Sequence, residues 1–149
     1  MRKLLFSFLL ICFCHVSNAQ MVYPYQDIKL EKPSDYKETE AMALSAAKFL
    51  LGTPFVEVFL NKWMSGTKDY QFYLQGFVQD LSVDLNLLSL YIPAMIKYTL
   101  ENKAEAVNPI KVEQYTSQIV LAYCNDPKNN FKLKKKLRKL LEDHQPVKN

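Results

Sequence analysis

The clearest hydrophobic pattern in the chain lies in residues 69–88. Large apolar residues recur there at the i, i+3, i+4, i+7 spacing of one helix face; they are Tyr70, Tyr73, Leu74, Phe77, Leu81, Leu85 and Leu88. Gly76 lies in the middle of this stretch, where a glycine costs about 1 kcal/mol relative to alanine and usually lets another helix come close. We therefore predict that residues 69–88 form the central helix, with Tyr73 and Gly76 as structural positions on it.

Further helical segments flank this central helix. They cover residues 34–51, 53–66, 93–102 and 108–124. Thr53-Pro54 and Asn108-Pro109 each place a capping residue directly before a proline, which is typical of a helix start. Pro93 disfavours helical backbone at the residue before it, so we expect a break before Pro93 and a new helix after it.

The fold class predicted by these patterns is all-α, because no β-alternation of useful length interrupts them. We expect a single small bundle of about five to six helices after a cleaved signal peptide. The bundle occupies residues 34–127 and follows an irregular lead-in over residues 20–33. The only tryptophan, Trp63, lies on the apolar face of the segment 53–66. We expect it to anchor the core and not to serve as a platform for a ligand.

Residues 1–19 have the composition of a secretory signal peptide. Two basic residues precede an apolar run over residues 4–16, and Ser17-Asn18-Ala19 places small residues before a cut at Gln20. The run is shorter than the roughly 20 apolar residues of a spanning helix, which disfavours an uncleaved anchor. A lipoprotein signal is the other alternative, but large residues precede both cysteines of this region. We therefore expect an exported protein, either periplasmic or secreted.

Cleavage leaves one cysteine and one histidine, Cys124 and His144. We expect Cys124 to be a small buried hydrophobe, with an intermolecular disulfide as the alternative. One histidine outside the predicted bundle supplies no His-based zinc site and no Cys-His or Ser-His-Asp arrangement. Asp80 and Asp84 have the spacing of one helix face, but the sequence shows no second acidic pair that could complete a metal or acid/base site with them. We therefore assign no catalytic residue, cofactor or metal ligand.

Residues 128–149 form a basic amphipathic segment and tail. They carry eight Lys or Arg residues against two acidic ones, whereas residues 21–127 carry nine against thirteen. An apolar stripe runs along the segment at Leu133, Leu137, Leu140 and Leu141. Such a helix can bind an anionic membrane surface, and the candidate surface-binding residues are Lys132, Lys135, Arg138 and Lys139. The alternative is that the stripe docks on the domain and leaves the lysines in solvent. We expect no nucleic-acid partner, because the destination is outside the cytoplasm.

Three short motifs follow one another along the chain: YLQGFVQDL over residues 73–81, YIP over 91–93 and IVLAYC over 119–124. Their order resembles the small periplasmic Rap/Tai-type immunity proteins of type VI secretion. Those proteins are signal-bearing helical domains with an aromatic-x-x-Gly motif in a central helix. The cysteine that the family places near this glycine has no counterpart here, where Tyr70 and Phe72 stand. The resemblance implies a protein that binds and blocks a toxin delivered into the periplasm.

These observations favour a non-catalytic exported binding protein whose partner is another protein. A toxin-neutralising immunity protein is the sharpest version of this hypothesis. The alternative is an envelope or membrane-surface-associated helical protein that uses its basic C-terminal helix. A small hydrolase that combines Asp or Glu with Tyr is a third class, and no residue pair stands out by its spacing to support it.

Overall fold

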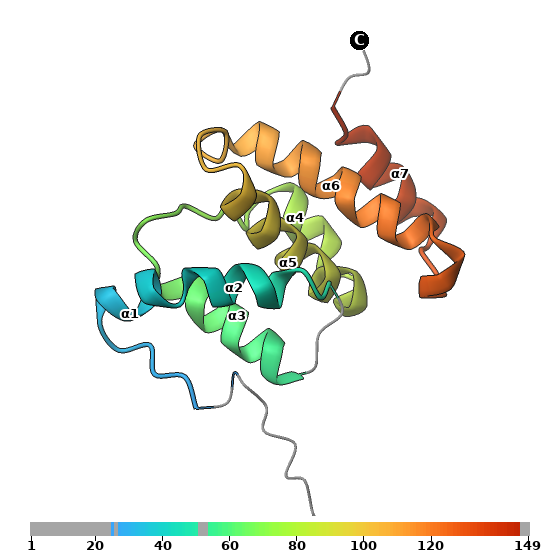
Figure 1. The fold of residues 1–149 in the computed structure, drawn as a ribbon. Coiled ribbons are helices and arrows are strands. Elements are labelled where there is room, and N and C mark those ends of the chain that lie inside the picture. The colour runs from blue at the N-terminus through green and yellow to red at the C-terminus, as the bar shows by residue number, and fades with distance from the viewer. Residues whose placement is uncertain (1–24, 26, 51–53, 147–149) are drawn as a thin grey trace, which may run out of the picture.

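The computed structural model describes residues 25, 27–50 and 54–146, and the predicted signal peptide lies outside these ranges (Figure 1). The described residues contain helices and no strand, which confirms the all-α prediction. The α-helices are α1 Pro33–Glu38, α2 Glu40–Ala47, α3 Pro54–Gly66, α4 Phe77–Leu81, α5 Leu85–Glu101, α6 Pro109–Asn125 and α7 Lys135–Asp143. A 3-10 turn, η1, covers Pro127–Asn129 between α6 and α7.

Helix α5 lies at the centre of the bundle. It packs against α2 and α3 on one side and against α6 on the other, and α7 packs on α6 (Figure 1). Its buried residues are therefore almost continuous along the helix; they are Leu87, Leu90, Tyr91, Pro93, Ala94, Met95, Ile96, Tyr98, Thr99 and Leu100. A helix that is apolar on nearly all sides belongs in the interior of a bundle, so α5 and not the segment 69–88 is the central helix.

The predicted single helix over residues 69–88 is wrong. Residues up to Gly76 are not helical, α4 is one short turn, and α5 begins after Asp84. The reason is aromatic packing: the rings of Tyr70 and Phe72 both lie against Trp63, with centroids 6.0 and 6.3 Å from it. Residues two apart share one side of an extended chain but not of a helix, so these contacts require extended backbone.

The predicted break before Pro93 is also wrong, because α5 continues through this proline. Pro93 is buried in the interior, where contacts on both sides of α5 hold the residues before it in helical backbone. A proline inside a helix removes the hydrogen bond to the carbonyl of residue i−4, which here is Ser89. The helix thus keeps its course and loses one internal hydrogen bond.

The first predicted helix is interrupted at Thr39, which separates α1 from α2. The indole nitrogen of Trp63 donates to the backbone carbonyl of Tyr36 at 2.9 Å. The hydroxyl of Thr39 donates to the carbonyl of Asp35 at 2.6 Å. The indole therefore occupies the Tyr36 carbonyl, which a continuous helix would bond to the amide of residue 40. The Asp35 carbonyl, in contrast, keeps its helical bond from the Thr39 amide at 3.0 Å. The helix starts at Pro54 and Pro109 are as predicted, and the side chain of Asn108 accepts from two amides of α6. The predicted capping residue Thr53 lies outside the described residues.

The C-terminal segment is part of the same core. Leu137 and Leu141 are buried, and Leu133 and Leu140 are half-buried against the other core residues. The Lys134 ammonium also pairs with the Asp84 carboxylate at 3.0 Å. The docked arrangement of the leucine stripe is therefore the one that the structure adopts.

Candidate functional site

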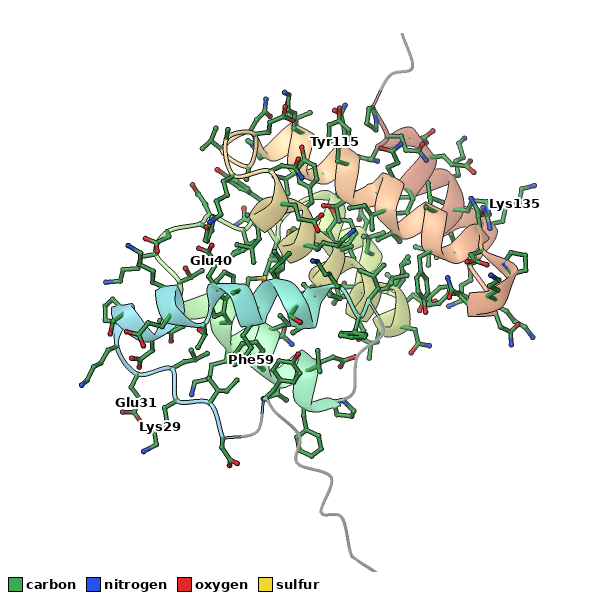
Figure 2. All side chains as sticks on the ribbon, viewed as in Figure 1. Lys29, Glu31, Glu40, Phe59, Tyr115 and Lys135 are labelled. Carbon is green, nitrogen blue, oxygen red and sulfur yellow. The ribbon has the colours of Figure 1, made fainter. Side chains whose placement is uncertain are left out.

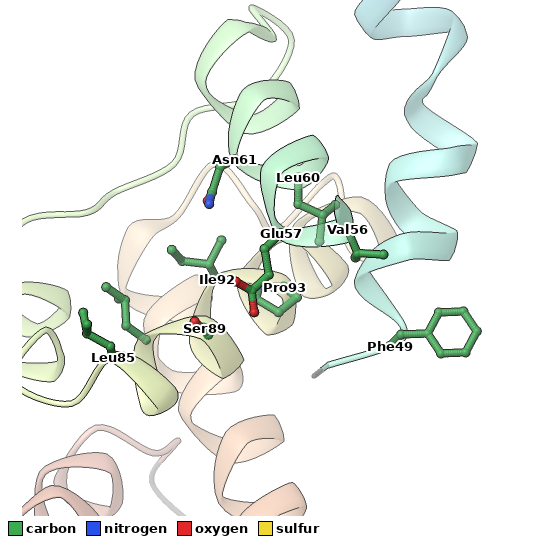
Figure 3. Close-up of a pocket in the computed structure, with 10 residues that line it drawn as sticks. Phe49, Val56, Glu57, Leu60, Asn61, Leu85, Ser89, Ile92 and Pro93 are labelled. Carbon is green, nitrogen blue, oxygen red and sulfur yellow. The ribbon is translucent and has the colours of Figure 1, made fainter. Parts of the chain in front are cut away.

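An apolar groove lies between α3 and α5, near the end of α2 (Figure 3). Its volume is about 230 Å³. The groove is lined by Phe49, Val56, Glu57, Leu60, Asn61, Leu85, Leu88, Ser89, Ile92 and Pro93. Six of these ten side chains are aliphatic or proline, so the lining suits an apolar group of a partner.

The two walls of the groove follow from helix periodicity. On α3, Val56 and Leu60 are four residues apart, as are Glu57 and Asn61. On α5, Leu85, Ser89 and Pro93 follow one another at the same interval. Side chains four residues apart stand one above the other on a helix. Each wall is therefore a straight row on a rigid helix, which fixes the shape of the groove.

Three side chains bring polar atoms to this apolar lining: Glu57, Asn61 and Ser89. Glu57 is half-buried in the first turn of α3, where a negative charge interacts favourably with the helix dipole. Pro93 has no amide hydrogen, so the carbonyl of Ser89 lacks its regular helical donor. The groove therefore presents hydrogen-bond acceptors close to aliphatic side chains.

The rim of the groove exposes large apolar groups. Leu85 is 73% exposed at the start of α5, and Phe49 is 65% exposed after α2. The ring of Phe49 is directed away from the other lining residues (Figure 3). The sequence pattern placed Leu85 and Leu88 on one apolar helix face but did not distinguish a core position from a groove position. No pattern in the sequence indicated that Glu57, Ser89 and Pro93 would line one site.

A second, larger hollow of about 770 Å³ lies beside Tyr70 and Lys103. Lys103 and Tyr70, two of the residues that line this hollow, already have partners within the protein. The Lys103 ammonium pairs with the Glu40 carboxylate and lies 5.7 Å from the centre of the Tyr70 ring. The Tyr70 hydroxyl donates to Glu40 Oε2 at 2.6 Å. These contacts join α2, the extended segment after α3 and the end of α5, so we interpret the cluster as structural.

The four predicted structural residues have different surroundings. Trp63 is fully buried and is the aromatic centre of the α3 side of the core. Cys124 is a buried free thiol, and burial raises its pKa to about 11, although Arg138 opposes the shift. Gly76 and Tyr73 are corrections to the sequence-based interpretation. A Cβ at Gly76 would meet nothing within 4 Å, and Tyr73 is 37% exposed. Neither residue lies inside a helix, because the packing of Tyr70 and Phe72 against Trp63 keeps this part of the backbone extended.

The predicted surface-binding residues lie on the outer side of α7 and just before it. Lys132, Lys135 and Lys139 are exposed, and Lys135 projects from the edge of the molecule (Figure 2). Arg138 is half-buried, and its guanidinium donates to Asn125 Oδ1 at 2.5 Å. The structure therefore separates Arg138, which ties α7 to α6, from the three lysines, which are available to a partner.

Two other features that could indicate a function in the described residues are a group of metal ligands and a membrane-spanning helix. No group of three or more His, Cys, Asp and Glu side chains there has an arrangement that could hold a metal ion. None of the helices within these ranges combines the length and the hydropathy needed to cross a bilayer.

The described residues form a small helical bundle with an apolar groove between α3 and α5. Comparison with known proteins finds no matching family model, no matching curated protein and no matching solved structure. The resemblance to Rap/Tai-type immunity proteins therefore stays a prediction from the sequence motifs.

Proposed function

We propose that this chain is a non-catalytic binding protein that holds a partner protein in the groove between α3 and α5. The observation that carries the proposal is the apolar groove itself, with Leu85 73% exposed at its rim. Concave, mostly apolar surfaces with a few polar groups are the usual form of a binding site. The groove walls are helix rows, so the site is formed before the partner arrives and little ordering free energy opposes binding.

The chemistry of the lining supports binding over catalysis. The groove offers one carboxylate, one amide and one hydroxyl, from Glu57, Asn61 and Ser89. A hydrolytic site needs a nucleophile with an adjacent base, or two carboxylates on opposite sides of the reacting bond. These three groups satisfy neither requirement.

We further propose that the protein is exported and that its partner is a secreted toxin. The composition of residues 1–19 supports a signal peptide, and the motif order supports an immunity protein that neutralises a secreted toxin. In that role the groove would receive a protruding segment of the toxin and keep it from its target. Tight inhibitors of this kind act by steric block, so they require no chemistry of their own.

A pull-down from envelope extract tests the proposal with two matched variants. Leu85→Asp places a charge on the groove rim, in the first turn of α5. Ile110→Asp makes the same change in the first turn of α6, where Ile110 is 66% exposed outside the groove. We expect the wild type and Ile110→Asp to retain one specific protein that Leu85→Asp loses. Equal retention by both variants would show that the groove is not the binding site.

A second candidate function rests on the exposed lysines of the C-terminal segment. Lys132, Lys135 and Lys139 face solvent, whereas the leucines of α7 are turned into the core. An anionic membrane surface would therefore be bound through charge alone and without insertion of the helix. Binding to vesicles that contain phosphatidylserine, and its loss in a Lys132→Ala, Lys135→Ala, Lys139→Ala variant, would support this candidate. Binding that persists in the variant would contradict it.

A further inference from the structure

We infer that the groove between α3 and α5 selects a cationic side chain, namely a lysine of the partner that enters with its aliphatic stem along the apolar walls. This inference rests on the proposed function and specifies the partner's chemistry. Glu57 carries the only charge among the described residues that line the groove. No ion pair or side-chain hydrogen bond in the described part of the chain engages its carboxylate. The charge is therefore available to a group from outside.

The other polar atoms of the groove reinforce the same choice. An ammonium group has three donors and no acceptor. The carboxylate of Glu57 can accept one of these hydrogens, and the Ser89 carbonyl, freed by the proline at position 93, can accept another. The hydroxyl of Ser89 and the amide oxygen of Asn61 are further acceptors at the same site. An anionic ligand would find only the Asn61 amide and the Ser89 hydroxyl as donors, beside a like charge.

The size of the groove fits one side chain. Its volume of about 230 Å³ is below the roughly 300–1,000 Å³ of sites that enclose whole small molecules. A lysine stem is apolar and its end is charged, which matches aliphatic walls with acceptors among them. Val56, Leu60 and Ile92 supply these walls.

The wider charge distribution of the chain is mixed. Residues 21–127, which include both walls of the groove, carry thirteen acidic residues and nine basic ones. Residues 128–149 add eight basic residues and two acidic ones, so the chain from residue 21 onward is net positive. The attraction of a cation to the groove therefore depends on Glu57 itself. Four of the basic residues of the C-terminal segment lie on α7, which packs on α6, and Lys134 before it pairs with Asp84.

Three probes of equal chain length test the inference on the purified protein. Hexylammonium, hexanol and hexanoate share one alkyl chain and differ in charge. The backbone amide shifts of Ser89 and Ile92 in two-dimensional NMR report occupation of the groove. We expect hexylammonium to bind with a dissociation constant about fivefold below that of hexanoate, the size expected of one partly exposed ion pair. Glu57→Gln should remove this preference, while Glu38→Gln, an exposed acid on α1, should leave it unchanged.

The outcomes separate the inference from the proposed function. If all three probes bind equally, or hexanoate binds best, the groove accepts apolar groups without selecting a cation. That result overturns the inference and leaves the proposed function standing. If no probe shifts Ser89 or Ile92, the groove is not a binding site and both fail. A preference that survives in Glu57→Gln would assign the selectivity to another group and would also overturn the inference.

Discussion

Gly66, the last residue of α3, lies directly against the ring of Tyr36. A Cβ built on this glycine would overlap the hydroxyl and the neighbouring carbons of that ring. The Tyr36 hydroxyl also donates to the carbonyl of Leu30 at 3.2 Å, which limits its freedom to move away. Of the two glycines that the structure describes, the closely packed one is therefore Gly66, at the contact between α1 and α3, and not Gly76.

Replacement of Gly66 by alanine should destabilise the fold by about 1–3 kcal/mol, the usual cost of overpacking. Urea unfolding of Gly66→Ala measures this loss. In a Tyr36→Ala background the same replacement should cost much less, because the ring that it meets is gone. Equal costs in the two backgrounds would show that the contact with Tyr36 is not the cause.

Gly76 should also resist substitution, but through its backbone and not through space. Its φ of 60° lies in the region that L-residues rarely adopt, and such conformations cost roughly 1–3 kcal/mol. We expect Gly76→Ala and Gly76→Asn both to lower the free energy of unfolding by about this amount, since a ψ of −117° lies outside the left-handed helical region that asparagine tolerates. If both variants were as stable as the wild type, the positive φ would not be required.

Glu40 should make stability depend on pH in the acidic range. Burial acts to raise its pKa, but hydrogen bonds from Lys103 and Tyr70 outweigh it and hold the pKa below the ordinary value of 4.5. The folded state therefore takes up this proton less readily than the unfolded chain. The contribution of Glu40 is present above pH 4.5 and is lost as the pH falls through the lower folded-state pKa.

Glu40→Gln measures that contribution. At pH 7 it should lower the free energy of unfolding by about 0.5–1.5 kcal/mol, the usual range for a hydrogen bond. At pH 3 the difference from the wild type should shrink. Glu38→Gln, two residues earlier and exposed, serves as the control and should change neither value. A Glu40→Gln effect of equal size at both pH values would contradict a charged role for this carboxylate.

The last helix should open before the rest of the bundle. Helix α7 has nine residues and meets the core mainly through Leu137 and Leu141, and an ion pair from the exposed Lys134 to the half-buried Asp84 helps to hold it. Salt screens such pairs, so its opening should be easier at high ionic strength. Hydrogen exchange should be faster in residues 137–141 than in residues 94–100 of α5, and the gap should widen in 1 M salt. Equal rates would mean that α7 opens only with the whole core.

Sequence periodicity predicted the fold class and the helices at Pro54 and Pro109, because capping residues and apolar spacing agree there. It failed over residues 69–88, where the spacing of apolar residues matched a helix by coincidence. The alternation of Tyr70 and Phe72 around Gln71 was the informative feature, since only an extended chain places both rings against Trp63. The failure at Pro93 has a different cause: tertiary packing around a buried helix overrode the local preference of one residue.

The groove could not be predicted in the same way. Its walls come from two helices separated in the sequence, and Leu85, Leu88 and Ile92 look like ordinary core residues in their own segment. Only the crossing of α3 over α5 leaves them partly uncovered. The position of Glu57 in the sequence did not indicate a groove residue either, because an acid in the first turn of a helix is common for electrostatic reasons alone.

Site-specific photocrosslinking tests the central claim most directly. A benzophenone amino acid replaces Leu85 at the groove rim or, as the control, Ile110 on the surface of α6, in cells that naturally express the protein. We predict one crosslinked protein partner from position 85 that is absent from position 110 and is lost when Ile92→Trp fills the groove. Crosslinks of equal yield from the two positions, or a position-85 product that persists in the filled groove, would contradict a partner-binding role for the groove.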